Sequence, residues 1–163
     1  MATPKTFNRV LRVEHITILS DKTFDAVRAA LESLVPVLDT DLIPELTSGD
    51  RAAIEAREKS GPSLYRFLER DHGAILAIAG RRRNAIQYEI GNPITASKMT
   101  RHSLGASLYA PLRITLFELD DESCAFEYDL PSSLFGQFGD ERVRDVGLHL
   151  DRELESVLIK AAT

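Results

Sequence analysis

Two short β-prone runs, separated by only four polar residues, constrain the fold of this chain more than any other feature. The runs are "LRITLFEL" at residues 112–119 and "CAFEYDL" at residues 124–130, and "DDES" joins them. Apolar, β-branched and aromatic residues in runs this short and this close together predict a β-hairpin. The chain is therefore expected to contain antiparallel strands.

The N-terminal third has the pattern of a strand followed by a helix. Residues 9–19 are rich in β-branched residues and predict a strand. Ser20 is expected to cap a helix that Pro36 ends, since apolar residues recur between them at helical spacing. Residues 36–48 contain two prolines and no clean period, which predicts a loop or a short extended piece.

The middle of the chain is more charged. Ser48 is expected to cap a surface helix over residues 50–59, and residues 63–70 predict a further turn or two of helix. After them, "GAILAIA" at 73–79 and "NAIQYEI" at 84–90 have the composition of strands. The residues between these two runs, including Arg81 to Arg83, are expected to form a hairpin tip.

The C-terminal third favours helices again. Pro131 is expected to start a short helix, and Asp140 leads into a long one whose apolar residues recur at helical spacing. The order of elements predicts an α+β fold with an antiparallel sheet and helices on one face. At 163 residues, the whole of 1–163 is expected to be one domain.

Composition excludes several classes of function. A net charge of −5 gives no global attraction for nucleic acid or for an anionic membrane, so neither is expected as a partner. A single cysteine permits no disulfide within the chain. We find no signal peptide or membrane-spanning stretch, which predicts a cytoplasmic protein. Nucleotide-loop and zinc-protease motifs are absent and the four histidines are widely spaced, so no cofactor and no metal are expected.

Strand alternation sorts the side chains of the predicted sheet into two faces. One face is apolar and is expected to pack on the helices. The other carries a polar set: His15, Gln87, Glu89, Arg113, Thr115, Phe117 and Glu127. Such a set is typical of a solvated face with cross-strand ion pairs. The alternative is a pocket or a dimer face with Glu89, Arg113 and Glu127 at its floor.

The stretch "YEIGNPITASKMTRH" at residues 88–102 predicts a strand that turns into a helix. Gly91 permits a turn conformation that other residues resist, Asn92 is a favoured N-cap, and Pro93 suits the first helical position. The backbone N–H groups of Ile94 and Thr95 are free to hold an anion. A capped corner with no ligand is the simpler interpretation.

Basic residues follow this corner. Lys98, Arg101 and His102 lie near one another at helical spacing and are candidates for a rim that attracts anions. Together with Asn92 and Thr95 of the corner, and with Arg113 from the following strand, they are the candidate ligand-binding residues. A solvated helix face is the alternative.

These segments resemble the family called domain of unknown function 302. The resemblance is carried by "YEIGNPITASKMTRH", "LYAPLRITLFE" and "FEYDLPSSL" and is strongest over residues 85–138. It implies a family-like core at about 10–35 and 72–160, with a charged helical insert at about 45–70. It also implies a curved antiparallel sheet like half of the TATA-box-binding protein and small proteins that self-associate, but no reaction.

Two hypotheses for function follow. The first is a homodimeric module without catalysis that binds a small, anionic ligand or a protein partner. The second is an enzyme in which Glu89 or Glu127 acts as a general base while Arg113 or His102 holds an anionic group. An enclosed carboxylate with a raised pKa favours the enzyme, and a broad exposed surface favours the binding module.

Overall fold

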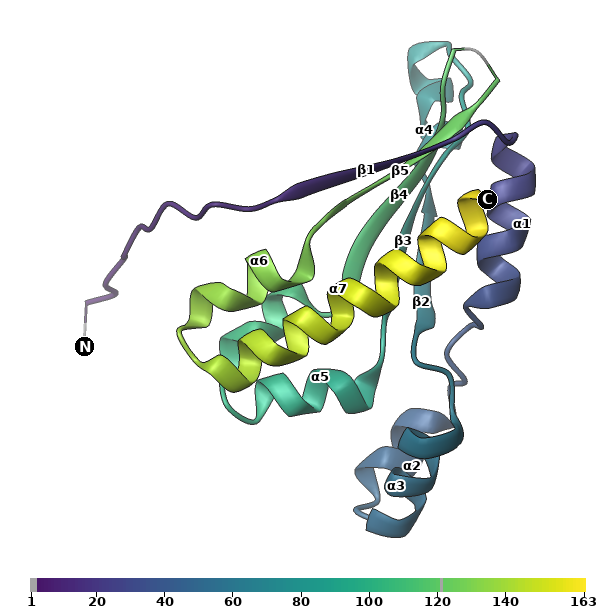
Figure 1. Cartoon of the computed structure of the whole chain (residues 1–163). Coiled ribbons are helices and arrows are strands. Elements are labelled where there is room, and N and C mark those ends of the chain that lie inside the picture. Colours follow the sequence, from purple (N-terminus) through teal and green to yellow (C-terminus); the bar gives the residue numbers. More distant parts are fainter. Residues whose placement is uncertain (1–2, 121) are drawn as a thin grey trace.

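The fold is a five-stranded antiparallel sheet with helices, which confirms the predicted α+β class (Figure 1). A computed structural model describes residues 3–120 and 122–163. The strands lie in the order β1-β5-β4-β3-β2 and the sheet is not closed. Their bounds are β1 (His15–Ser20), β2 (Tyr65–Asp71), β3 (Ala85–Gly91), β4 (Leu112–Glu118) and β5 (Cys124–Asp129).

Two helices provide the main cover for one face of the sheet. They are α1 (Phe24–Leu34) and α7 (Glu141–Ala162), which contact each other and the strands beneath them (Figure 1). The shorter helices are α2 (Leu42–Thr47), α3 (Arg51–Ser60), α4 (His72–Ile75), α5 (Pro93–Thr100) and α6 (Pro131–Phe135), with 3₁₀ turns η1 (Leu76–Ala79), η2 (Leu104–Tyr109) and η3 (Gly136–Phe138). Helices α2 and α3 lie away from the sheet, at the lower end of the view (Figure 1).

The register of the sheet confirms the predicted assignment of side chains to its two faces. Tyr88 is paired with Ile114, and Ile114 with Tyr128, so their side chains form one buried row. The next row along the strands holds Glu89 opposite Arg113 on the other face. Because a slip of one residue would exchange the faces, this agreement fixes which side chains meet the solvent.

The hydrophobic core lies between the sheet and α7. Helix α7 begins just after Asp140, as the sequence predicts, and the Asp140 side chain accepts a hydrogen bond from the Arg142 backbone N–H. Its residues Val143, Leu154 and Leu158 are fully buried against the strands. This 22-residue helix therefore supplies one long wall of the core.

Two element predictions in the middle of the chain are wrong, and the loop predicted over 36–48 is wrong in part because residues 42–47 form α2. Residues 63–70 were expected to be helical, but 65–71 form strand β2, which pairs with β3 on both sides of a bulge between Arg66 and Leu68. Residues 73–79 were expected to form a strand, but they form α4 and η1 at the tip of the hairpin. Because β2 already occupies the free edge of β3, the later run has no strand to pair with. The Asp71 carboxylate instead caps a helical turn at Ala74 N.

Smaller differences occur toward the N-terminus. Only residues 15–20 of the predicted strand at 9–19 pair in the sheet. Thr23 caps α1 in place of Ser20, whose hydroxyl donates to the Ala162 carbonyl instead. Asp50 caps α3 in place of Ser48, with bonds from two backbone N–H groups.

Candidate functional site

The corner between β3 and α5 is held by the side chain of Asn92. Its Oδ1 accepts hydrogen bonds from Ile94 N at 2.9 Å and Thr95 N at 3.3 Å, as expected for an N-cap. Its Nδ2 donates to the carbonyls of Pro62 and Ser63, at 3.2 and 3.3 Å, in the segment that leads into β2. The amide is therefore occupied on both sides, and the N–H groups proposed for an anion are already bonded to Asn92.

Gly91 has a different role from the one the sequence predicts. It is not among the glycines of the described chain with positive φ, so the corner needs no conformation reserved for glycine. A Cβ built at this position would lie 3.6 Å from Phe67 Cε2 and from Pro111, an ordinary contact distance. Gly91 therefore leaves open the space that a side chain would fill.

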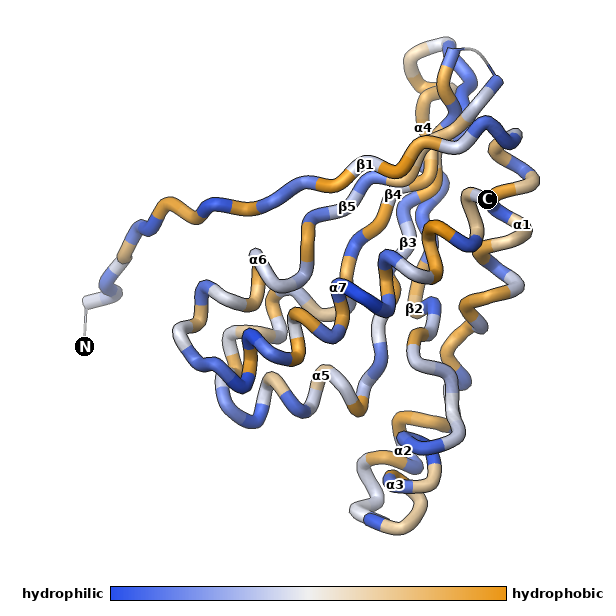
Figure 2. The backbone as a smooth tube through the Cα atoms, viewed as in Figure 1, coloured by the Kyte–Doolittle hydropathy of each residue, from blue (hydrophilic) through white to orange (hydrophobic). Residues whose placement is uncertain are grey.

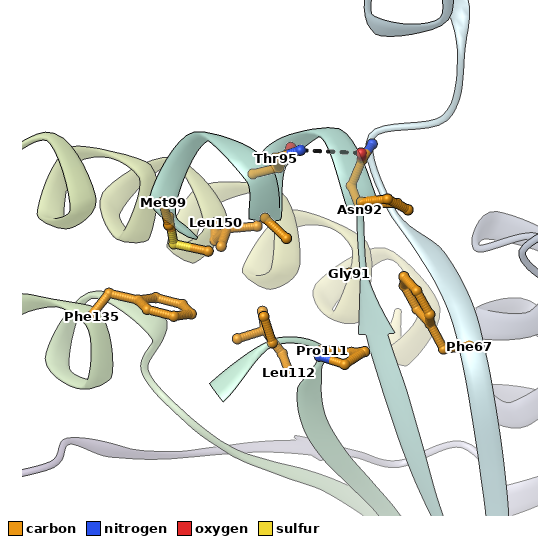
Figure 3. A pocket seen from close by; sticks show the side chains of 12 residues that line it. Phe67, Gly91, Asn92, Thr95, Met99, Pro111, Leu112, Phe135 and Leu150 are labelled. Atoms are coloured by element: carbon orange, nitrogen blue, oxygen red, sulfur yellow. Dashed lines mark hydrogen bonds between the residues drawn. The ribbon is translucent and has the colours of Figure 1, made fainter. Parts of the chain in front are cut away.

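That space is part of a pocket beneath the corner, with a volume of about 100 Å³ (Figure 3). Its walls are almost entirely apolar and come from β2, β3, α5, β4, α6 and α7. They are formed by Phe67, Gly91, Asn92, Pro93, Thr95, Ala96, Met99, Ala110, Pro111, Leu112, Phe135 and Leu150. Phe67 and Phe135 lie at opposite ends, and Gly91 lies between them (Figure 3).

Thr95 is the polar residue of this pocket that retains hydrogen-bonding capacity. Its backbone N–H is bonded to Asn92, but within the described residues its hydroxyl has no hydrogen-bond partner. The side chain is half-buried at the start of α5. A ligand whose apolar part enters the pocket can thus meet one free hydroxyl there.

The three basic candidates do not line the pocket. The Lys98 ammonium contacts the Glu58 carboxylate of α3, which ties α5 to the charged helix. Arg101 and His102 are exposed just beyond α5. The predicted anion-binding rim is therefore present as neighbouring surface charge and is not joined to the cavity.

Arg113 and Glu89 lie on the open face of the sheet, where the sequence places them. Glu89 is bound by Arg70 of the edge strand, with Arg70 Nη1 2.7 Å from Glu89 Oε1. Arg113 is exposed and, among the described residues, makes no ion pair with a carboxylate. Glu89, Arg113 and Glu127 thus do not form one polar site, because Glu89 is paired with Arg70 and not with Arg113.

Glu127, the third of these candidates, forms a cluster with a histidine. His15 Nε2 is 3.5 Å from Glu127 Oε2, and His15 Nδ1 is 3.0 Å from Asp129 Oδ1. The hydrogen bond that His15 Nδ1 donates to the Asp129 carboxylate, together with the negative charges of Glu127 and Asp129, raises the pKa of His15 above its usual 6.5. All three side chains are 40% exposed or more, so the cluster lies on a surface and not in a cavity.

The described residues show no metal centre and no membrane-spanning helix. They contain no group of three or more His, Cys, Asp or Glu side chains placed to hold a metal ion. Their helices include none with the length and apolar character required to cross a membrane.

The sequence revealed the corner but not the pocket beneath it. Phe67, Pro111, Phe135 and Leu150 were not among the candidate residues, because they come from elements that only the tertiary structure brings together. One signal was available, since Gly91 ends a strand whose alternate residues are large and apolar. A glycine in that position indicates space or close approach as readily as a turn.

Comparisons with known proteins agree with this architecture. The model of the family described as domain of unknown function DUF302 matches residues 52–161. The chain belongs to this family. A solved structure of an uncharacterized conserved DUF302 protein from Bacillus stearothermophilus is similar over 90% of this chain and 97% of that one. It has a TM-score of 0.65 at 13% identity. Among curated proteins, none matches.

The shared fold extends the earlier resemblance to most of the chain. The family match begins at residue 52, so it includes β2 and most of α3 as well as the corner. At 13% identity, the solved structure supports the fold alone. The detailed likeness to the TATA-box-binding protein stays a prediction. Membership of the DUF302 family assigns no reaction, so the function has to be argued from the site.

Proposed function

We propose that this DUF302 protein is a small-ligand-binding module that takes the apolar group of its ligand into the pocket beneath the Gly91 corner. The observation that carries this proposal is the pocket itself. It is apolar, it is lined by six elements of the fold, and its one available hydroxyl is that of Thr95. Apolar walls with few polar groups are typical of ligand sites.

The size of the pocket limits what it can accept. Pockets that enclose a whole drug-sized ligand have volumes of roughly 300–1,000 Å³, well above the 100 Å³ here. An engineered cavity of about 150 Å³ in another protein binds benzene. We therefore expect one aromatic ring or one branched alkyl group to be bound, with the rest of the molecule outside.

The chemistry of the walls favours a neutral group within the pocket. Burying an unpaired charge among apolar side chains is costly, and the described residues that line the cavity include no cation. An anionic ligand, as the sequence led us to expect, would have to keep its charge outside. Arg101 and His102 are exposed just beyond α5 and are the basic side chains available for such a group.

Filling the pocket tests this proposal. Gly91→Ala places a methyl group in ordinary contact with Phe67 and Pro111 and reduces the free space. The matched control is Gly136→Ala, because a Cβ there meets nothing within 4 Å. Phenol, toluene and isobutanol serve as probes in two-dimensional NMR titrations of labelled protein. We expect saturable shifts at the amides of Gly91, Thr95 and Ala96, weakened at least about tenfold by Gly91→Ala.

The control variant should bind these probes as the wild type does. Equal binding by the wild type and Gly91→Ala would place the ligand elsewhere. The absence of saturable shifts with any of the three probes would remove the pocket as a ligand site.

The cluster around His15 supports a second candidate, an enzyme in which Glu127 is the general base. His15 lies within reach of both Glu127 and Asp129, and a histidine held between carboxylates is a common means of moving protons. Glu89 is less available for this role because its carboxylate is already ion-paired with Arg70. Arg113 has no carboxylate partner in the described chain and would hold the anionic group.

Hydrolysis of a panel of chromogenic esters tests this candidate. The wild type should exceed the buffer rate, and Glu127→Gln should lose that excess. Glu122→Gln, an exposed change outside the cluster, is the control. A wild type at the buffer rate, or equal rates in Glu127→Gln and the control, would contradict it.

A further inference from the structure

The segment before β1 is extended and projects past the helices, with the Arg9 side chain donating a hydrogen bond to Gln137 Oε1 at 3.2 Å (Figure 1). Within the described chain, no backbone hydrogen bond involves residues 3–13. Phe7 is 89% exposed and Val10 is 95% exposed. Apolar and polar residues alternate along part of it (Figure 2), as in a strand that buries one of its two faces. We refer to residues 3–13 as the N-terminal arm.

The arm continues a strand that has a free edge. Among the described residues, β1 pairs only with β5, so its second side is open. The Glu14 carbonyl accepts from Leu130 N and so points toward β5. Because backbone groups alternate in an antiparallel ladder, those of Val13, His15 and Thr17 point to the open side. An open edge next to an unpaired, β-prone segment is a template for pairing with another chain.

We propose that residues 7–19 pair antiparallel with the same residues of a second copy, around a two-fold axis at Val13. Each arm then pairs with the open edge of β1 in the other copy, and the two five-stranded sheets join into one. The sequence led us to expect a homodimer, and this pairing names the surface that would form it. A self-complementary interface of this kind is what two-fold symmetry requires.

The axis at Val13 follows from the residues that it places opposite one another. A two-fold axis perpendicular to the sheet lets one residue face its own copy, and the others pair symmetrically about it. With Val13 at the axis, Arg12 faces Glu14, Val10 faces Ile16 and Phe7 faces Leu19. These are opposite charges and apolar pairs, which stabilise a ladder.

Neighbouring registers are less favourable. An axis at Arg9 or at Arg12 brings two guanidinium groups face to face, which destabilises a strand pair. An axis at Val10 or Leu11 avoids that contact but places no opposite charges across the pair, since Arg12 and Glu14 then face uncharged residues. The register at Val13 also pairs Phe7 with Leu19, which is 70% exposed in the single chain.

This interface lies at the edge of the sheet opposite the pocket. The corner pocket draws on β2, β3 and β4, whereas the pairing uses β1 and the arm. The inference therefore goes beyond the proposed ligand binding, and either can fail without the other.

Sedimentation velocity of the full chain gives the first test. We expect a species of twice the 18.1 kDa chain mass. Arg12→Glu places like charges opposite Glu14 twice in each dimer and should weaken association about tenfold or more. Glu14→Arg should do the same, and the double variant should restore the dimer. Arg9→Glu is the matched control, since it makes the same charge change in the arm but faces Thr17.

Cysteine cross-linking tests the register. Two residues at a two-fold axis in a hydrogen-bonded pair have Cα atoms about 5.5 Å apart, within disulfide range. Val13→Cys should therefore form an intermolecular disulfide under mild oxidation. Phe7→Cys should not, because its two copies would lie about 40 Å apart. Ile78→Cys is the control for random collision, since Ile78 is 90% exposed at the far hairpin. The one native cysteine, Cys124, is buried.

Three results would overturn the proposal. The first is a full chain that remains a monomer at every concentration tested. The second is a dimer that the charge swaps and Arg9→Glu affect equally. The third is cross-linking of Val13→Cys no faster than that of Ile78→Cys.

Discussion

The corner pocket and the open face of the sheet are two candidate surfaces with opposite properties. The pocket has a defined shape and almost no polar groups, since Asn92 uses its whole amide to hold the corner. The open face has many charged groups but no cavity among the described residues around His15, Glu127 and Asp129. The pocket is therefore a cavity with few polar groups, and the open face is a charged surface with no cavity in this region.

This difference bears on which surface is better suited to a ligand. Exposed ion pairs are screened by water and are worth little, so charge on a flat surface binds small molecules weakly. A concave apolar site removes area from water and gains from each carbon buried. The comparison favours the pocket for a small ligand and the open face for solvent or a broad partner.

The largest expected effect comes from Phe135, which is fully buried and forms one end of the pocket. Phe135→Ala removes a large side chain from the core and should lower the free energy of unfolding by about 3–5 kcal/mol. Urea denaturation measures this loss. The variant should also bind probes larger than phenol, because the cavity grows.

Leu134→Ala is the control for Phe135, since it truncates the half-buried neighbour on the same helix. Leu134→Ala should lower the free energy of unfolding less than Phe135→Ala does, and it should leave probe binding unchanged. If both truncations cost the same and neither changes the choice of probe, Phe135 is not a wall of the pocket.

The corner itself should contribute less than the core. Asn92→Ala loses two cap bonds and two bonds to the segment before β2, and should cost about 1–2 kcal/mol. Asn92→Asp keeps the acceptors for the cap and loses the donors, so it should fall between the wild type and Asn92→Ala. Thermal unfolding of the three proteins gives the order. If Asn92→Asp is as unstable as Asn92→Ala, the hydrogen bonds to Pro62 and Ser63 contribute more to stability than the cap does.

Local chemistry allowed the C-terminal half of the fold to be predicted. The β4–β5 hairpin, the Asn92 cap and the start of α7 at Asp140 each depend on residues close in sequence. Alternation along the strands was enough to place Glu89 and Arg113 on the open face. These features are confirmed because neighbours in the chain decide them.

Competition between distant segments decided the rest. Residues 65–71 and 73–79 have similar β propensity, and only one of them can occupy the edge of β3. Propensity cannot decide which of the two segments becomes the strand, since strand formation depends on the partner strand. The pocket was missed for a similar reason, because Phe67 and Leu150 meet only after β2 and α7 are both in place.

The open face should tolerate substitution better than the pocket. Glu89→Gln removes the charge from the pair with Arg70 but leaves a hydrogen-bonding side chain. Surface ion pairs contribute under about 1 kcal/mol, so the free energy of unfolding should change by less than that. Chemical denaturation checks this value. A loss as large as that of Phe135→Ala would mean that the open face carries stability that its exposure does not indicate.

The smallest effect concerns the charge on His15. Asp129 and Glu127 raise the pKa of His15 above 6.5, so His15 should lose its proton at a higher pH than an ordinary histidine. Asp129→Asn should move this pKa back toward 6.5. Folding then gains a small stability that is fully present below pH 6.5 and is lost as the pH rises through the raised pKa. NMR titration of the histidine ring protons measures both variants. An unchanged pKa in Asp129→Asn would mean that Glu127 sets the shift, which would strengthen the enzyme candidate and narrow the contrast with the pocket.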